Sequence, residues 1–201
     1  MTGTGGRRER KKAQTRQALN DAALRLFSEK GYDNVGVREV AQAADVALST
    51  LFKHFPTKEA LVFDEDADIE AGLVAAVRDR APGRSVLHAL RDHLIATRTK
   101  PHGDDPLSAV HVTLVESTPA LQDYARRMWL RHEDALTAVI AQATGLDADA
   151  PTVTGLARFA METPGLARTA DDPPAVMRAL FDLLEHGWAG TPAARTPGPR
   201  S

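Results

Sequence analysis

Positively charged side chains gather at the start of the chain, where they could bind phosphate groups. Six of them lie within the first 16 residues, opposed there only by Glu9: Arg7, Arg8, Arg10, Lys11, Lys12 and Arg16. Residues 1–58 hold 11 Lys and Arg against 6 Asp and Glu, a net +5, whereas the remainder holds 14 against 21, a net −7. A basic module on an acidic body is typical of a nucleic-acid-binding head, because phosphate neutralisation dominates such affinity. A solvated basic tail has the same composition, so charge alone leaves both interpretations open.

The segments that carry these charges are predicted to be helices. Aromatic residues make up only 5% of the 201, and Ala and Leu recur at spacings of three and four, which favours an all-α protein. A long helix over residues 8–30 is expected to end at Gly31. Two short helices, over 37–44 and 48–55, follow with a tight turn between them. This spacing matches the helix-turn-helix motif, whose second helix enters the DNA major groove, although helix hairpins without a DNA partner share it.

The residue types in this region decide between the two interpretations. The run GYDNVGVREVA occupies residues 31–41, and ADVALSTLFKHFPTKEAL occupies residues 44–61. With the residues from 16 onward, these runs resemble the TetR family of bacterial transcriptional regulators. The resemblance implies an N-terminal three-helix helix-turn-helix DNA-binding domain with a basic arm over residues 1–57. A larger helical ligand-binding and dimerisation domain would follow over 58–190, and a disordered tail is expected over 191–201.

The resemblance also assigns a set of DNA-facing residues. Leu48, Ser49 and Thr50 lie at the start of the predicted recognition helix, where side chains reach base edges. Arg38, on the preceding helix, has the side chain best suited to bidentate contact with guanine. The other predicted contacts, mainly to the sugar-phosphate backbone, are Phe52, Lys53, His54 and Lys58. For His54 a structural, partly buried histidine is the alternative.

Departures from the family pattern affect how strongly the predicted DNA-binding domain, residues 1–57 and called the head below, binds DNA. Val35 and Gly36 stand where the family has two threonines. Ala47 replaces the usual N-cap serine, which predicts a recognition helix weaker by about 1 kcal/mol. Phe52 replaces a tyrosine, so it loses a hydroxyl that could bind phosphate but keeps the ring, which can still pack against a sugar or a thymine methyl. Thr57 is expected to cap the next helix.

The acidic remainder is predicted to form further helices around a ligand cavity. Their expected ranges are 58–80, 85–99, 107–117, 119–144, 151–161 and 173–186. Large or polar-tipped residues on otherwise apolar helices are the candidates for ligand contact: His93, His111, Met128, Trp129 and Met161. Each of these is also typical of ordinary packing. The resemblance implies that the last two helices pair with those of a second subunit.

Several classes of protein are not expected from this sequence. It has no Cys, which excludes disulfides, Cys zinc sites and thiol redox sensing. No phosphate loop, nucleophile elbow, paired catalytic carboxylates or metal-ligand spacing is present, so we expect no enzyme, no cofactor and no metal. No signal peptide or membrane-spanning run is found, which predicts a cytoplasmic protein without a membrane partner.

The sequence therefore predicts a homodimeric repressor that binds a pseudo-palindromic operator in double-stranded DNA. A small, apolar effector would shift the helix beginning at Lys58, pivot the two heads and release the operator. An activator fits the same residues. A helical binding or enzymatic module without DNA function is the alternative from another class.

Overall fold

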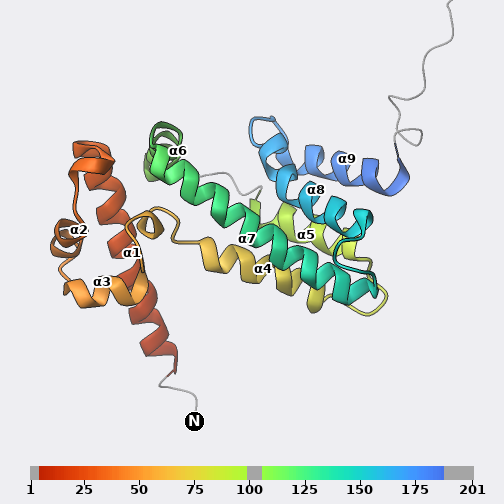
Figure 1. Ribbon diagram of the computed structural model, residues 1–201, viewed down its shortest axis with the longest axis horizontal. Coiled ribbons are helices and arrows are strands. Elements are labelled where there is room, and N and C mark those ends of the chain that lie inside the picture. The colour runs from red at the N-terminus through yellow and green to blue at the C-terminus, as the bar shows by residue number, and fades with distance from the viewer. Residues whose placement is uncertain (1–4, 99–105, 188–201) are drawn as a thin grey trace, which may run out of the picture. The chain divides into compact units, whose positions relative to one another are not determined.

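The computed structural model describes residues 5–98 and 106–187, and all regular elements in these ranges are helical (Figure 1). They are α1 (Gly5–Lys30), the 3-10 turn η1 (Tyr32–Asn34), α2 (Val37–Ala43), α3 (Leu48–His54), the 3-10 turn η2 (Glu59–Leu61), α4 (Asp66–Arg78), α5 (Val86–Arg98), α6 (Pro106–Ser117), α7 (Pro119–Thr144), α8 (Pro151–Ala167) and α9 (Pro173–His186). The all-α prediction is confirmed. The expected disordered tail at 191–201 lies outside the described residues.

The chain divides into two compact units that do not follow chain order. Among the described residues, the first unit comprises 5–67 and 106–128, and the second comprises 68–98 and 129–187. The long helix α7 contributes its first turns to one unit and the rest to the other. The predicted functional domains, 1–57 and 58–190, divide the chain differently and stay predictions.

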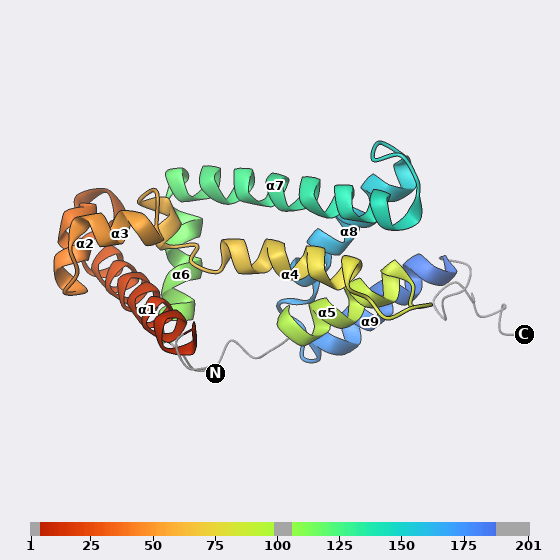
Figure 2. The ribbon, with the colours of Figure 1, turned by 90° about the horizontal axis from the view of Figure 1, so that it is seen from below.

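The first unit is built around α1, which lies between α2 and α6 (Figures 1 and 2). Its core combines buried side chains from the two short helices, from α1 and from a segment more than 80 residues further along. Representative members are Leu19, Phe27, Val40, Leu51, Phe55, Leu61, Leu114 and Leu121. Burying Leu114 and Leu121 in this core removes their apolar surface from water. Residues far along the chain therefore stabilise the packing around α1.

Two left-handed residues set the turns of the head. Gly31 has φ 83° and its amide bonds to the Phe27 carbonyl at 3.0 Å, so α1 ends where the sequence predicts. Asp45 has φ 54° in the turn between α2 and α3, a conformation that Asp tolerates better than most residues. The next amide, of Val46, bonds to the Ala41 carbonyl at 2.9 Å. These turns fix the direction in which α3 leaves α2.

The prediction of one continuous helix over 58–80 is wrong. The structure has the short turn η2, a break, and then α4 from Asp66. Thr57 Oγ1 accepts from the Ala60 amide at 3.3 Å at the start of η2, whose N-cap residue is Lys58, so Thr57 does not cap an α-helix as expected. Leu61 and Val62 are buried in the core of the first unit, and this tertiary packing ends the turn. Acidic residues then precede and begin α4, where they complement the helix dipole.

Asn20 holds η2 against α1. This side chain is buried, and its Nδ2 donates to the Leu61 carbonyl at 2.8 Å across 41 residues of sequence. Sequence reasoning missed it, because nothing in the local pattern separates Asn20 from a solvated helix residue. A buried amide with a buried carbonyl partner is costly to remove, since the carbonyl loses its donor.

We expect Asn20→Ala to lower the free energy of unfolding by roughly 1–3 kcal/mol, because the Leu61 carbonyl would stay buried without a donor. Urea unfolding followed by circular dichroism measures this. Gln17→Ala is the matched control, since the Gln17 amide is exposed and bonds only to Asp21 one turn away. Equal effects of the two substitutions would contradict the structural role of Asn20.

The second unit packs α4, α5, α8, α9 and the C-terminal part of α7 around its own core. Helix α7 has the predicted bounds, from Pro119 to Thr144. Helix α8 was expected to end at Met161 but continues through Pro164 to Ala167. Thr163 and Ala167 are buried, and the Thr163 hydroxyl donates to the Phe159 carbonyl at 2.7 Å. Burial of this last turn therefore outweighs the proline.

Candidate nucleic-acid interface

Helix α3 has three rows of side chains besides the row that is buried in the core. Leu51 and Phe55 are buried beneath it. Residues four apart on a helix share a face, so the remaining residues form three pairs, Leu48 with Phe52, Ser49 with Lys53, and Thr50 with His54. Phe52 is 47% exposed; Ser49 and Lys53 are also exposed, and the other three are half-buried. The predicted base-reading and backbone-binding residues of α3 thus lie on its outer surface.

Both helices of the motif begin without a side-chain cap. Gly36 precedes α2 and Ala47 precedes α3, and neither offers an oxygen to the first amides. Helix α3 starts instead with a backbone bond from the Thr50 amide to the Ala47 carbonyl at 2.8 Å. The missing caps leave amide groups unsatisfied at the surface that is predicted to face DNA.

Arg38 lies in the first turn of α2 and is exposed. The neighbouring Glu39 forms an ion pair with Lys30 at the end of α1. The acidic side chain nearest in sequence therefore has its own cationic partner on α1. A guanidinium presents five donors in a fixed fork, which suits either a guanine edge or a phosphate.

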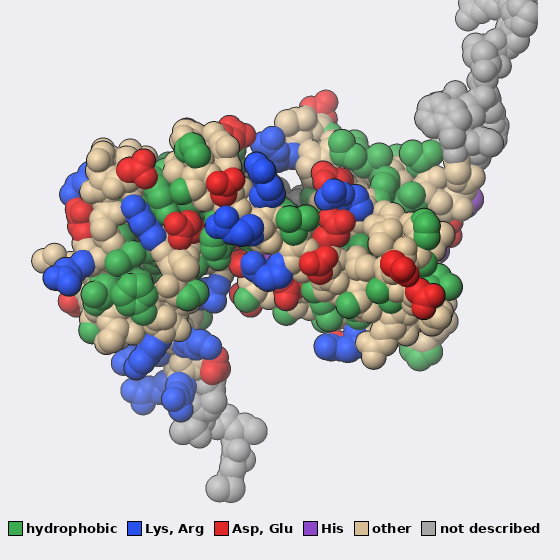
Figure 3. All heavy atoms as spheres, in the orientation of Figure 1, with side chains coloured by type: hydrophobic (Ala, Val, Ile, Leu, Met, Phe, Trp, Pro, Cys, Tyr) green, Lys and Arg blue, Asp and Glu red, His purple; other side chains and the backbone are tan. Residues whose placement is uncertain are grey.

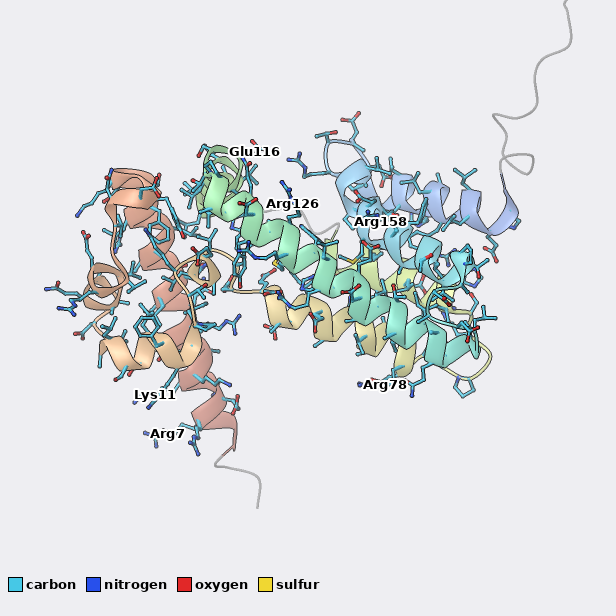
Figure 4. All side chains as sticks on the ribbon, viewed as in Figure 1. Arg7, Lys11, Arg78, Glu116, Arg126 and Arg158 are labelled. Carbon is cyan, nitrogen blue, oxygen red and sulfur yellow. The ribbon has the colours of Figure 1, made fainter. Side chains whose placement is uncertain are left out.

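The basic arm is helical as far as Gly5 and forms the first turns of α1. Its cationic side chains are exposed from Arg7 to Lys12. Figure 3 shows blue side chains gathered around the start of α1, and Figure 4 shows Arg7 and Lys11 projecting from it. Arg16, about one turn after Lys12, is half-buried with its guanidinium carbon 5.4 Å from the Phe55 ring centroid. The helix that carries the exposed cations of the arm thus also contacts Phe55, the residue that follows α3, through Arg16.

His54 is half-buried at the end of α3, close to the arm. Burial lowers the pKa of His54 below its ordinary value, and the positive charges of Lys12 and Arg16 lower this pKa further. The ring is therefore predominantly neutral at pH 7 in the free protein. A phosphate placed beside it would favour the protonated form and raise its pKa again.

A rise in the pKa of His54 on phosphate binding predicts that DNA binding depends on pH. If His54 contacts phosphate, the complex takes up a proton, so affinity should rise as pH falls, by at most about tenfold per pH unit between roughly pH 7.5 and 5.5. Fluorescence anisotropy titrations across this range measure the slope. His54→Gln should flatten it, whereas His88→Gln, on α5 of the second unit, should leave it unchanged. A slope that persists in His54→Gln would assign His54 to the structural alternative.

Lys58 has a partner within the protein. Its Nζ donates to the Tyr32 carbonyl at 2.6 Å and lies 4.0 Å from the Tyr32 ring centroid and 5.4 Å from that of Phe27. Burial lowers the pKa of Lys58, although Asp33 and Glu59 oppose this shift. The ammonium thus stabilises the turn after α1 through a hydrogen bond and cation–π contact. The predicted phosphate contact would have to share the ammonium with this site.

The five predicted ligand contacts divide between the two units. In the first unit, Met128 is buried, and the His111 ring meets Phe63 edge-on at 5.5 Å between centroids. In the second, Trp129 is 38% exposed. The other two members of the second unit are His93, against which a Cβ on Gly72 would come within 3.0 Å, and Met161, which packs at the edge of the core. A common site for these residues stays a prediction.

A buried polar group in the second unit was missed from the sequence. His132 is only 1% exposed and its Nε2 lies 3.8 Å from Glu70 Oε2 on α4. Arg131 Nε lies 3.7 Å from the same carboxylate oxygen, and the Trp129 ring meets His132 edge-on at 5.7 Å. The sequence places His132 in the apolar stripe of α7, but no local signal pairs it with a carboxylate 62 residues away.

Neither a metal centre nor a membrane span is found in the part of the chain that the structure describes. Within residues 5–98 and 106–187, no group of three or more His, Asp or Glu side chains could hold a metal ion. No helix in these ranges is long and apolar enough to cross a bilayer.

The fold and this surface define a helical protein with a helix-turn-helix head. Residues 19–64 match the family described as bacterial regulatory proteins, tetR family, and residues 84–189 match the MftR C-terminal domain. The second match covers more than half of the chain. The protein belongs to the TetR family of transcriptional regulators, and DNA-binding regulation of transcription is its function. Members of this family are regulators rather than enzymes; they bind DNA and small-molecule effectors and typically dimerise.

Two curated relatives carry names of regulators. TcmR of Streptomyces glaucescens, an HTH-type transcriptional regulator, is 32% identical over 151 residues, or 72% of this chain and 66% of its own. MftR of Mycobacterium tuberculosis, named for regulation of mycofactocin biosynthesis, is 26% identical over 137 residues, or 68% of this chain and 69% of its own. The chain thus matches about two thirds of the length of these relatives.

Solved structures agree with the fold. GusR of Salmonella enterica superposes with a TM-score of 0.52 at 21% identity, covering 85% of this chain and 95% of that one. A TetR-family regulator of Streptomyces coelicolor gives 0.51 at 20% identity, covering 86% and 96%. At these identities the likeness concerns the fold alone.

Proposed function

We propose that the protein is a homodimeric repressor that binds a pseudo-palindromic operator and is released by a small, apolar effector. The proposal is supported by the surface of α3, which carries the predicted base-reading residues. It is also supported by the exposed Arg38 on the preceding helix and by the exposed cations of the arm. One such head spans only a half-site, and a two-fold symmetric operator requires a two-fold symmetric protein. Its working compartment is the cytoplasm, where the chromosome is accessible.

Exposed leucines on the last two helices support the dimer. Leu166 on α8 is 62% exposed and Leu184 on α9 is 41% exposed, and Figure 3 shows hydrophobic side chains over α9. Burying such side chains against a second copy would remove their apolar surface from water. The proposed interface consists of α8 and α9 paired with the same helices of the partner.

Effector release is proposed to pass through the segment between η2 and α4. Because α4 begins at Asp66 rather than Lys58, the moving element is the break at 62–65 together with α4. On the head side, Asn20 ties η2 to α1, and α6 packs on the same helix. The proposed effector contacts are His111 and Met128 in the first unit and His93, Trp129 and Met161 in the second.

The experiment that tests the proposal begins with in vitro selection of DNA from a random duplex library. The proposal expects an enriched inverted repeat, bound by two protomers per duplex in sedimentation velocity. Placed between a promoter and a reporter, the repeat should lower expression in the presence of the protein. An activator would raise it, and a library without enrichment would contradict the proposed function.

A further inference from the structure

The recognition helix carries an unusual set of base readers. Its sequence, LSTLFKH, has no Asn, Gln, Arg, Asp or Glu, so Lys53 is the one residue of this helix among the charged and amide side chains that commonly read bases through hydrogen bonds. Ser49 and Thr50 can bond to several bases, so they discriminate weakly. The outer surface of α3 nevertheless includes one apolar row, formed by Leu48 and Phe52.

Phe52 is the most exposed member of this row and cannot form a hydrogen bond with phosphate. The residue is 47% exposed at the surface of the head, and Figure 3 shows hydrophobic side chains over α3. Leu48, one turn earlier, packs against the core with its inner side and is half-buried. A single exposed aromatic ring is ordinary on a protein surface, but this one lies beside the polar row of Ser49 and Lys53, on the helix predicted to enter the groove.

The two flanks of α3 differ in charge. The flank formed by Thr50 and His54 adjoins the basic arm, since Lys12 and Arg16 act on the His54 ring. The opposite flank, Leu48 and Phe52, has no charge of its own. Phosphate is favoured beside the first flank, which leaves the second for an uncharged part of the duplex. In the major groove the apolar group on the base edges is the C5 methyl of thymine.

We propose that Leu48 and Phe52 read thymine, each half-site placing thymine C5 methyl groups against this row. The inference rests on the proposed function, because it concerns the same surface and the same operator. It assigns specificity to apolar contact at these positions, with Arg38 as the guanidinium reader and Lys53 and His54 as backbone contacts. The selected half-site should therefore have an invariant thymine opposite the row.

The test replaces each thymine of the selected operator in turn by deoxyuridine, which removes one methyl group and leaves every hydrogen-bonding edge intact. Wild-type protein should lose about fourfold in affinity at one or more thymines of each half-site, the value of one buried methyl. In Phe52→Ala or Leu48→Ala, replacing the same thymine by deoxyuridine should cost no further affinity, because the side chain that contacts the methyl group is already missing. Ser49→Ala, on the neighbouring row, should retain the loss. Circular dichroism checks that each variant is folded.

Two results would overturn the inference while leaving the regulator in place. Equal affinity of wild-type protein for every deoxyuridine-substituted operator would assign Phe52 to the deoxyribose. An unchanged methyl dependence in both Phe52→Ala and Leu48→Ala would assign thymine reading to other residues. Failure of the selection to enrich any sequence is a different outcome, because it contradicts the proposed function itself.

Discussion

Replacing Arg38 by Ala is expected to weaken operator binding by about 1–3 kcal/mol, or roughly five- to 150-fold. Arg38 is exposed in the first turn of α2, so the loss would come from a contact with DNA and not from the fold. If the Arg38 guanidinium forms two hydrogen bonds with guanine, the substitution should also reduce specificity at that base pair. If it contacts phosphate, the substitution should weaken binding to all sequences equally. Anisotropy titrations against the operator and its single-base variants separate the two.

Two variants control this experiment. Arg38→Lys keeps the charge and loses the fork, so it should behave like Arg38→Ala at a guanine contact and like wild type at a simple phosphate contact. Arg78→Ala removes an exposed arginine from the end of α4 in the second unit (Figure 4) and should leave affinity unchanged. If Arg38→Ala binds as tightly as Arg78→Ala, Arg38 has no role in recognition.

The second large effect is expected from Leu51→Ala. Leu51 is fully buried beneath α3 in the core of the first unit, and truncating a buried leucine costs about 2–5 kcal/mol through lost burial and the cavity left behind. Because α3 has only seven residues and no side-chain cap, it depends on this packing more than a long helix would. Operator binding should therefore fall with the stability of the head.

Hydrogen exchange locates this effect. In Leu51→Ala the amides of α2 and α3 should exchange faster, while those of α8 and α9 in the second unit keep their protection. Leu146→Ala, at a 50% exposed position after α7, is the matched control and should change the free energy of unfolding by less than about 0.5 kcal/mol. Equal destabilisation by both substitutions would contradict the buried position of Leu51.

Elements with local signals were predictable from the sequence. Thr118 and Pro119 announce the start of α7 and Gly145 its end, and the helix has those bounds. The turns of the head were predictable too, because Gly31 and Asp45 adopt positive φ angles that few other residue types accept. The end of α3 follows from local chemistry as well, because Pro56 comes directly after its C-cap residue Phe55.

Features that depend on distant contacts were not predictable. The break before α4 follows from burial of Leu61 and its bond from Asn20, and neither has a local signature. The last turn of α8 survives Pro164 because Thr163 and Ala167 are buried. At the candidate site, the types and exposure of the α3 residues followed from helical periodicity, but the placement of Lys58 against Tyr32 and Phe27 did not. A lysine near phosphate-binding positions resembles an anchor until its packing partners are known.

Competition anisotropy shows whether the head recognises one DNA sequence. Full-length protein is titrated onto the selected operator and onto a scrambled duplex of equal length and composition, at several salt concentrations. We predict a preference for the operator of about a thousandfold or more. Affinity for both duplexes should fall steeply as the salt concentration rises, because binding of the arm releases counterions from the DNA and this release is less favourable at high salt. Equal affinity for the two duplexes at every salt concentration would contradict the account.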